Sequence, residues 1–207
     1  MAVVEEERIV GLSSVTIGSG VTSIDVSAFS RCSGLTSVTI PSSVTSIGSS
    51  AFSGCSGLIS TVIGDGVTSI GDNAFSGCSG LESFTFGKKV KNIGKEALKG
   101  CAAMKKLICK AVTPPVCGSQ AFDDIDKWSC VLQIPPGSLD SYTAAEPWSS
   151  FFFKETVGIK DITTDKATEE IEDCNYYDLN GQLLSQPRKG VNIVKMSNGT
   201  TKKVVVK

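Results

Sequence analysis

The chain has 207 residues, of which 41% are apolar, and its formal net charge is −1, from 20 basic and 21 acidic residues. This length fits one domain with at most a small appendage, and the balanced charge excludes a global basic field for nucleic acid. The sequence contains no His, so Ser-His-Asp triads, Cys-His dyads and HExxH zinc sites are excluded, which argues against most hydrolases.

The first residues do not have the character of a targeting segment. Met1–Arg8 carries three successive Glu where a signal peptide has basic residues, and no apolar stretch of signal-peptide length follows. A run of about 18 apolar residues, which a membrane span would need, occurs nowhere in the sequence. We therefore expect no membrane span and either a soluble chain or the mature or truncated form of an exported one.

A unit of 23 residues repeats along the first two thirds of the chain. Such register over four copies predicts a stacked solenoid, because one unit cannot bury its apolar face alone and a stack can. The matching columns are Val21, Val44, Val67 and Val90; Ile24, Ile47, Ile70 and Ile93; Ala28, Ala51, Ala74 and Ala97; and Leu35, Leu58, Leu81 and Met104.

Each unit contains two hydrophobic periods. Residues 37–40 (Ser-Val-Thr-Ile) alternate polar and apolar, which predicts a short strand with one buried face. Ala28, Cys32 and Leu35 are spaced by four and three, which predicts one helical turn. Ser27, and its counterparts Ser50 and Asn73, would cap that turn. The predicted unit is a strand, a turn and a helical turn, and the fold class is α/β, rich in β.

The last unit is degenerate and is followed by a predicted cap. Pro114-Pro115 should interrupt the strand pairing, and residues 137–148 are predicted to form a short helix with Ser138 as its N-cap. A bare terminal turn would expose apolar surface, so a solenoid needs such a cap. Trp128, Trp148 and the three Phe at 151–153 are predicted to seal the solenoid against the tail rather than to bind a sugar.

Residues 156–207 lose the 23-residue period. Asn180-Gly181 and Asn198-Gly199 stand between strand-like runs at 176–179, 182–184, 191–194 and 204–206, which is a strong hairpin signal. We therefore predict a solenoid with its cap in residues 1–155 and a small antiparallel all-β domain in residues 156–207.

The unit V-T-S-I-G-x-x-A-F-x-G-C-S-x-L-x-S-V-T-I-P resembles the BspA-like leucine-rich repeats over about residues 9–155. The resemblance implies a right-handed leucine-rich-repeat solenoid on a cell-surface or secreted protein of anaerobic bacteria. It also implies adhesion to host matrix proteins or to other cells, not catalysis. The tail is similar to C-terminal segments of secreted proteins from the same bacteria. Some of these are sorting signals, and since Asn192 stands where an aromatic is common, that role is left open here.

The outward strand positions are the first candidate binding surface and would form the inner, concave strip of such a stack. The third copy reads Thr61-Val62 where the second reads Val38-Thr39, so Thr61 is expected to point inward and Val62 outward. Small hydroxyls give few anchors, so the strip is either a weak multivalent surface or a plain β surface without a ligand. The candidates are Ser37, Thr39, Ser60, Val62, Ser83 and Thr85.

A Lys-rich fourth repeat is the second candidate. Between residues 88 and 110 there are eight Lys and one acid, Glu96. These Lys residues could form a docking patch for an acidic glycan, an anionic protein or a phosphate. They could instead be a solvated face of the solenoid. We favour the solvated face, because no aromatic residue is interleaved with the Lys residues for stacking on bases. The candidates are Lys88, Lys89, Lys91, Lys105 and Lys106.

Four of the eight Cys form one column of the repeat: Cys32, Cys55, Cys78 and Cys101. Stacked strands lie close enough for disulfides, but Ile9 falls in the same column, which favours buried thiols as a structural core column. The spacing of zinc knuckles is absent, and Asp123–Asp126 lacks the Gly and distal Glu of a calcium loop, so we expect no metal and no cofactor. A Cys117–Cys130 bridge is left open.

The sequence thus favours a non-catalytic binding protein whose suspected partner is a host matrix protein or a glycan. A structural spacer without a ligand is the alternative. An enzyme is the third possibility, and only scattered carboxylates would serve it.

Overall fold

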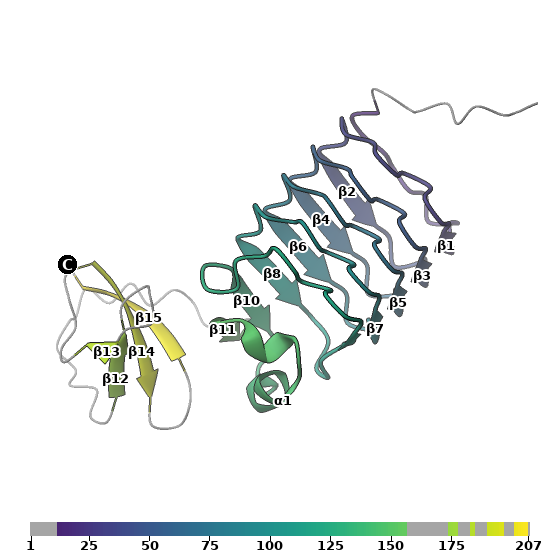
Figure 1. Ribbon diagram of the computed structural model, residues 1–207. Coiled ribbons are helices and arrows are strands. Elements are labelled where there is room, and N and C mark those ends of the chain that lie inside the picture. The colour runs from purple at the N-terminus through teal and green to yellow at the C-terminus, as the bar shows by residue number, and fades with distance from the viewer. Residues whose placement is uncertain (1–11, 157–173, 178–182, 185–189, 197–200, 207) are drawn as a thin grey trace, which may run out of the picture.

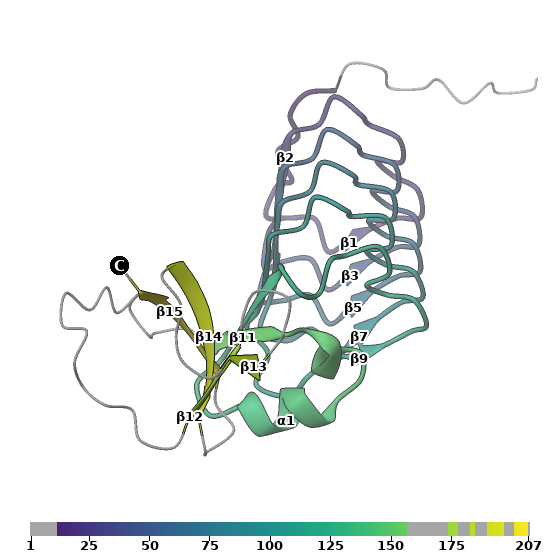
Figure 2. The same cartoon turned by 60° about the vertical axis from the view of Figure 1, so that its left-hand side comes forward.

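A computed structural model describes residues 12–156, 174–177, 183–184, 190–196 and 201–206, with side chains described as far as Phe152. From the first turn to β10 the chain winds into a β-solenoid of about five turns with two parallel sheets that line different sides of the coil (Figure 1 and Figure 2). Pairings such as Ser37↔Ser60 and Ser60↔Ser83 confirm the 23-residue repeat.

The large sheet is formed by the strands that the alternating pattern predicted. It is parallel, with the order β11-β10-β8-β6-β4-β2. Its strands are β2 (Ser37–Ile40), β4 (Ser60–Ile63), β6 (Ser83–Phe86), β8 (Lys106–Cys109), β10 (Val131–Ile134) and β11 (Phe153–Thr156). Strand β11 was not predicted, and it ends one residue beyond the expected domain boundary at 155.

The second sheet was also missed from the sequence. It consists of two-residue strands in the order β1-β3-β5-β7-β9. They are β1 (Ser23–Ile24), β3 (Ser46–Ile47), β5 (Ser69–Ile70), β7 (Asn92–Ile93) and β9 (Val116–Cys117). Strands this short carry no readable alternation, so only the stacking of the turns defines them.

The predicted helical turns are wrong, because the stack offers the backbone better partners. At alternate residues the N–H groups donate to carbonyls of the following turn, as from Phe29 to Ala51 at 2.7 Å and from Phe52 to Ala74 at 2.7 Å. Ser27, Ser50 and Asn73, the expected caps, have φ between 55° and 58° and so cannot begin a helix. The segment that carries the four-three spacing of apolar residues is a non-helical turn bonded to the next turn of the stack. The repeats are therefore β rather than α/β.

The Gly column after each short strand is explained by close approach of the turns. A Cβ at Gly71 would lie 2.6 Å from the backbone nitrogen of Ser49, and one at Gly48 would lie 2.6 Å from that of Val26. Only a residue without a Cβ fits between adjacent turns at this column. The need for glycine here comes from this lack of space and not from backbone conformation, since φ at Gly48 and Gly71 is not in the left-handed region.

Stacked aromatic rings connect the core along the solenoid axis. Phe29, Phe52 and Phe75 stack with centroids 5.0 Å apart at each step. The fourth copy has Leu98 in place of Phe, and there Phe84 from the large sheet packs edge-on against Phe75 at 4.9 Å. Every one of these residues except Phe29 is fully buried.

The predicted cap is present after β10. Helix α1 (Leu139–Ala144) and the 3-10 helix η1 (Trp148–Ser150) bury Tyr142 and Trp148 against the last turn. Ser138 stands at the N-cap position, but its hydroxyl donates to the carbonyl of Pro135 and makes no capping bond.

The tail contains a four-stranded antiparallel sheet in the order β13-β12-β14-β15. Its strands are β12 (Cys174–Tyr177), β13 (Leu183–Leu184), β14 (Gly190–Met196) and β15 (Thr201–Val206), close to the predicted runs. The two Asn-Gly pairs lie outside the described residues. The division into two domains stays a prediction.

Candidate binding surface

The outward face of the large sheet presents two columns of side chains in register. One column contains Ser37, Ser60, Ser83, Lys106 and Val131, and the other contains Thr39, Val62, Thr85, Ile108 and Gln133. In β2 the burial alternates, with Ser37 and Thr39 exposed and the intervening Val38 buried. Parallel pairing therefore places the predicted strip residues on one continuous face.

The middle of this face is less polar than the sequence indicated. Ser60 and Ser83 are half-buried, and Val62 is 40% exposed. Thr85 was expected on the surface but is only 8% exposed, although its neighbours in the same column, Val62 and Ile108, are more exposed. Thr85 is thus not an accessible contact residue.

The reversed order in the third copy has the expected consequence. Thr61 points into the core, where it is 1% exposed and pairs with Val38 and Phe84 in the adjacent strands. The hydroxyl of Thr61 is buried without a hydrogen-bond partner among the described residues. The exposure of Val62 therefore comes with a buried polar group, which is unfavourable.

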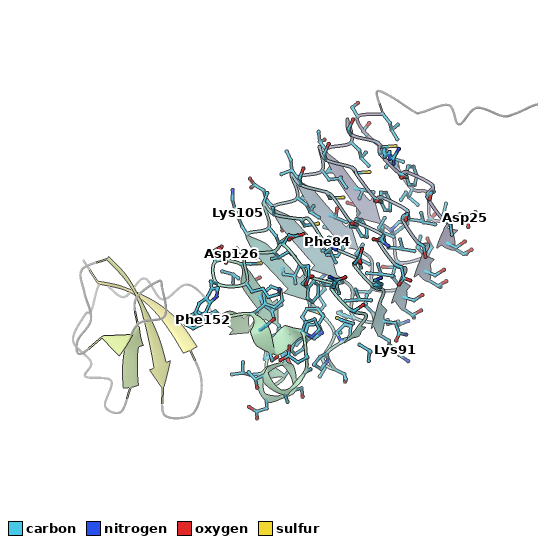
Figure 3. All side chains as sticks on the ribbon, viewed as in Figure 1. Asp25, Phe84, Lys91, Lys105, Asp126 and Phe152 are labelled. Carbon is cyan, nitrogen blue, oxygen red and sulfur yellow. The ribbon has the colours of Figure 1, made fainter. Side chains whose placement is uncertain are left out.

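The eight Lys do not gather on one face. They follow the fourth repeat around the coil, so that Lys91 and Lys105 lie on different sides of the solenoid (Figure 3). Acids pair with four of them: Lys88 with Asp65 at 3.4 Å, Lys105 with Glu82 at 2.8 Å, and Lys95 and Lys99 with Glu96. The backbone N–H of Lys88, and then its ammonium group, lower the pKa of Asp65.

Among the described residues, no ion pair involves Lys89, Lys91, Lys106 or Lys110. Of these, only Lys106 belongs to the large sheet, where it begins β8. The structure thus places Lys106 on the strip and Lys105 just before β8, and it leaves Lys88, Lys89 and Lys91 elsewhere on the turn.

The Cys column is buried and contains free thiols. Each thiol from the second copy onward donates to a Phe carbonyl of the preceding turn: Cys55 to Phe29 at 3.0 Å, Cys78 to Phe52 at 3.2 Å, and Cys101 to Phe75 at 3.4 Å. Burial raises the pKa of Cys55 to about 11 and that of Cys101 to about 12. The column therefore cross-links turns by weak hydrogen bonds and is not reactive.

The remaining described thiols are also unpaired. Cys109 and Cys130 are buried, Cys117 is half-buried, and the possible Cys117–Cys130 bridge does not form. Within the described part of the chain, no three His, Cys, Asp or Glu residues approach one another as metal ligands would.

Trp128 is the functional candidate that the sequence interpretation misplaced. Trp148 and Phe151 are buried in the cap as expected, but Trp128 is 55% exposed and stacks on Phe152 with centroids 4.7 Å apart. Its loop precedes β10 and belongs to the longest turn, as the pairing of Lys106 with Val131 shows. This turn is two residues longer than the regular 23-residue unit, and that extra length was the available sequence signal.

A shallow pocket of about 250 Å³ lies beside the last turn. Its walls include Asp123 and Lys127 of the last turn and Glu146 of the cap.

The comparisons with known proteins agree with this architecture. A family profile described as the BspA-type leucine-rich repeat region matches residues 8–128 in six copies. A search of curated proteins finds no match. In the described residues, we find no helix with the length and apolar character of a membrane span.

Among solved structures, the chain is similar to a leucine-rich repeat protein of T. pallidum, with 26% identity, a TM-score of 0.53, and 59% of this chain and 58% of that chain covered. It is also similar to a leucine-rich cell surface protein of Faecalibacterium prausnitzii, with 24% identity and a TM-score of 0.48. That match covers 72% of this chain and 33% of the other. The chain therefore spans about a third to three fifths of the length of these structures.

Proposed function

This chain belongs to the BspA-type leucine-rich repeat family, and from that membership we propose that it is a non-catalytic binding protein at the bacterial surface or in the secreted fraction. Binding is a general property of this family. The absence of His from the sequence further supports a role without acid-base catalysis at neutral pH.

The observation that carries the proposal is the continuous outward face of the large sheet. Three successive 23-residue units present Ser37, Thr39, Ser60, Val62 and Ser83 in register on a stack whose backbone is hydrogen-bonded from turn to turn. Such a face is rigid before binding, so little entropy is lost when a partner docks. Small side chains contribute little each, and we propose that affinity comes from contacts repeated along the stack.

The partner that we propose is a host matrix protein or a glycan. Lys106 begins β8 on this face and makes no ion pair in the described residues, so it would attract an acidic partner, with an association rate that falls as salt rises. Lys88, Lys89 and Lys91 lie elsewhere on the turn, so we propose no direct contact for them.

The test measures binding of the purified chain to a panel of matrix proteins, mucins and glycans at two salt concentrations. Val62→Glu, in the middle of the face, should weaken binding at least about tenfold. Val26→Glu is the matched control, because Val26 is also exposed but follows β1 on the other sheet. Equal binding by the two variants would exclude this face.

The alternative is a spacer that presents other parts of a larger protein. Deleting one 23-residue unit keeps the register of the stack while shortening it. If the deletion and Val62→Glu both leave cell adhesion unchanged, the spacer function is favoured over binding.

A further inference from the structure

Three backbone N–H groups on one side of the last turn have no acceptor among the described residues. We call them the donor row, and they belong to Gln120, Phe122 and Asp124. In the four earlier turns the equivalent N–H groups donate to carbonyls of the following turn at 2.6–3.1 Å. The φ angles of Gln120 and Asp124, 60° and 66°, are close to those of their equivalents Glu96 and Gly100, 55° and 77°. The last turn therefore keeps the backbone shape that binds a following turn.

The carbonyl of Cys117 adds one acceptor beside the donor row. It stands where Ile93 in the preceding turn accepts the N–H of Gly118 at 2.8 Å. In an earlier turn, one segment of six residues makes all four bonds. Between Gly48 and Ser53, for example, the first residue donates while the second, fourth and sixth accept or stand ready as acceptors for the turn before them. The last turn offers the same four groups, and no described part of the chain is bonded to them.

The shallow pocket of about 250 Å³ lies along these four groups, since its walls include every residue from Cys117 to Asp123. Its other walls are Lys127, Glu146 and Pro147, which follow in the chain. The cap covers the core beside the pocket, with α1 at the end of the solenoid (Figure 2). A second solenoid therefore cannot stack on this end, whereas a single segment of chain can enter the pocket.

The bonding pattern defines the backbone of the segment that fits. A helix is excluded, because its own N–H groups use its carbonyls, whereas this segment must offer its second, fourth and sixth carbonyls to the last turn. The third residue of the segment has a φ of 56° at Ser50 and of 55° at Asn73 and Glu96. Glycine and asparagine adopt this left-handed conformation most readily, so one of them is expected at the third position.

The space at the last turn restricts the side chains of the segment. Its first residue should be Gly, as in the repeats, where a Cβ at Gly94 would lie 2.4 Å from the backbone nitrogen of Asp72. Its fifth residue occupies the place of the stacked Phe in the repeats. That place is already filled, because Trp148 and Phe151 pack on Phe122 with centroids at 4.8 and 5.5 Å, so the fifth residue should also be small. The fourth residue should be Ala, since the equivalent residues are fully buried: Ala51, Ala74 and Ala97.

The charges around the pocket favour a basic segment. Asp123 and Glu146 line the pocket together with one cation, Lys127, and Asp124 carries the last N–H of the donor row. In the described part of the chain, none of these three acids makes an ion pair. A segment with Lys at its outward positions would therefore be attracted to this end of the solenoid.

We propose that the last turn is a docking site for a basic, glycine-containing segment of a partner polypeptide, which takes the shape of a repeat turn and fills the donor row. Partner strands bind exposed sheet edges by the same principle, with main-chain hydrogen bonds giving affinity and side-chain pockets giving selectivity. None of the pocket walls belongs to the large sheet, so this site is separate from the outward face of that sheet. The inference therefore goes beyond the binding proposed for that face.

The experiment measures amide hydrogen exchange by NMR on the isotope-labelled full chain. In the free chain, the N–H groups of the donor row should exchange at least about tenfold faster than their equivalents at Glu96 and Leu98, which donate at 3.0 and 2.9 Å. The probe is the acetylated and amidated peptide Gly-Lys-Asn-Ala-Gly-Lys. Adding it should slow exchange at the donor row and leave the equivalents in the preceding turn unchanged. The acidic counterpart, Gly-Glu-Asn-Ala-Gly-Glu, should bind at least about tenfold more weakly.

Two variants test the pocket itself. Ser119→Trp places a bulky side chain at an exposed residue of the pocket wall and should weaken peptide binding at least about tenfold. Thr143→Trp is its control, because Thr143 is exposed on α1 and is not part of the wall. Glu146→Gln keeps an acceptor for the Ser149 hydroxyl but removes one charge, and it should weaken binding about twofold to fivefold. Asp140→Asn, the same loss of charge elsewhere in the cap, should have no effect.

The proposal is overturned if the donor row is as protected in the free chain as its equivalents, or if the basic peptide at millimolar concentration leaves its exchange unchanged. Equal binding of the basic and acidic peptides would contradict a basic partner. Protection of the donor row that rises with protein concentration, without peptide, would show that a second copy occupies the site instead. Val62→Glu should leave peptide binding unchanged, so failure of this site and failure of the proposed binding face are distinguishable.

Discussion

The phenol hydroxyl of Tyr142 donates to the backbone carbonyl of Ala111 at 2.7 Å, and this bond connects the cap helix to the last turn of the solenoid. The indole N–H of Trp148 makes the equivalent contact to the carbonyl of Pro115 at 2.8 Å. Both carbonyls belong to the last turn of the solenoid. In an earlier turn such a carbonyl accepts from the following turn, as that of Lys91 does from the N–H of Val116, whereas here the cap takes the place of a following turn and its side chains supply the donors.

Removing the Tyr142 hydroxyl should therefore destabilise the folded chain without changing the packing of its ring. We expect Tyr142→Phe to lower the free energy of unfolding by about 1–3 kcal/mol, since a buried carbonyl loses its donor. Thr143→Val, which removes an exposed hydroxyl on the same helix, should change it by less than about 0.5 kcal/mol. Urea denaturation of both variants measures the difference, and equal stability would show that the bond contributes nothing.

Thr61→Val should stabilise the protein. It removes a buried hydroxyl that has no partner in the described structure and leaves a side chain of the same shape between Val38 and Phe84. The expected gain is about 1–2 kcal/mol in the free energy of unfolding. Thr39→Val on the exposed face is the control and should be close to neutral, and a loss of stability in Thr61→Val would mean that the hydroxyl is satisfied in solution.

Gly71→Ala should be strongly destabilising, because its Cβ would lie 2.6 Å from the backbone nitrogen of Ser49 and the turns would have to separate. A cost of about 2–4 kcal/mol is expected from overpacking with backbone displacement. Gly20→Ala provides the comparison, since a methyl group added there would have no atom within 4 Å outside its immediate chain neighbours. Thermal unfolding of the two variants decides the matter, and similar melting temperatures would contradict the close approach.

Stability should decrease above pH 9 because of the buried thiols. The ordinary thiol pKa is 9.0, and burial raises it to about 11 in Cys55 and about 12 in Cys101. Below pH 9.0 both states keep the proton and the full stability is present. Between pH 9.0 and about 11–12 the unfolded chain releases protons that the folded chain retains, so each thiol lowers stability by up to about 1.4 kcal/mol per pH unit.

The measurement for this prediction is urea denaturation at pH 7.5, 9 and 10.5 under reducing conditions. A Cys55→Ala variant should be less stable at pH 7.5 but show a shallower decline with pH than the parent chain. A decline of equal slope in both proteins would assign the pH dependence to other groups.

The regular copies could be predicted because identical residues recur at a fixed spacing. Val44, Leu58 and Cys78 were placed in the core from their columns alone, and all three are buried. A column does not fix the exposure of each of its members, since Thr85 is buried although Val62 in the same column is 40% exposed. The helical turns were mispredicted because four-three spacing does not distinguish a helix from a coiled turn whose N–H groups bind the next turn.

The candidate binding surface was also predicted only in part. Pairing in register placed Ser37, Thr39 and Val62 on one face, as their alternation predicted, because a strand turns successive side chains to opposite sides. The Lys-rich segment was contiguous in sequence but is wound around the coil, so contiguity did not produce a patch. Trp128 lies in the turn that is two residues longer than the regular unit, and only the folded loop shows that its ring stays exposed.

The sequence by itself determined the period, the register of the stack and the identity of the core columns, because a repeat imposes one solution on every copy. The tertiary structure alone decided which hydroxyls are accessible, where each Lys lies on the turn, and how the last turn is closed by Tyr142 and Trp148. Those outcomes depend on the sizes of side chains in adjacent turns and on the path of the inserted residues, and a pattern within one unit contains neither.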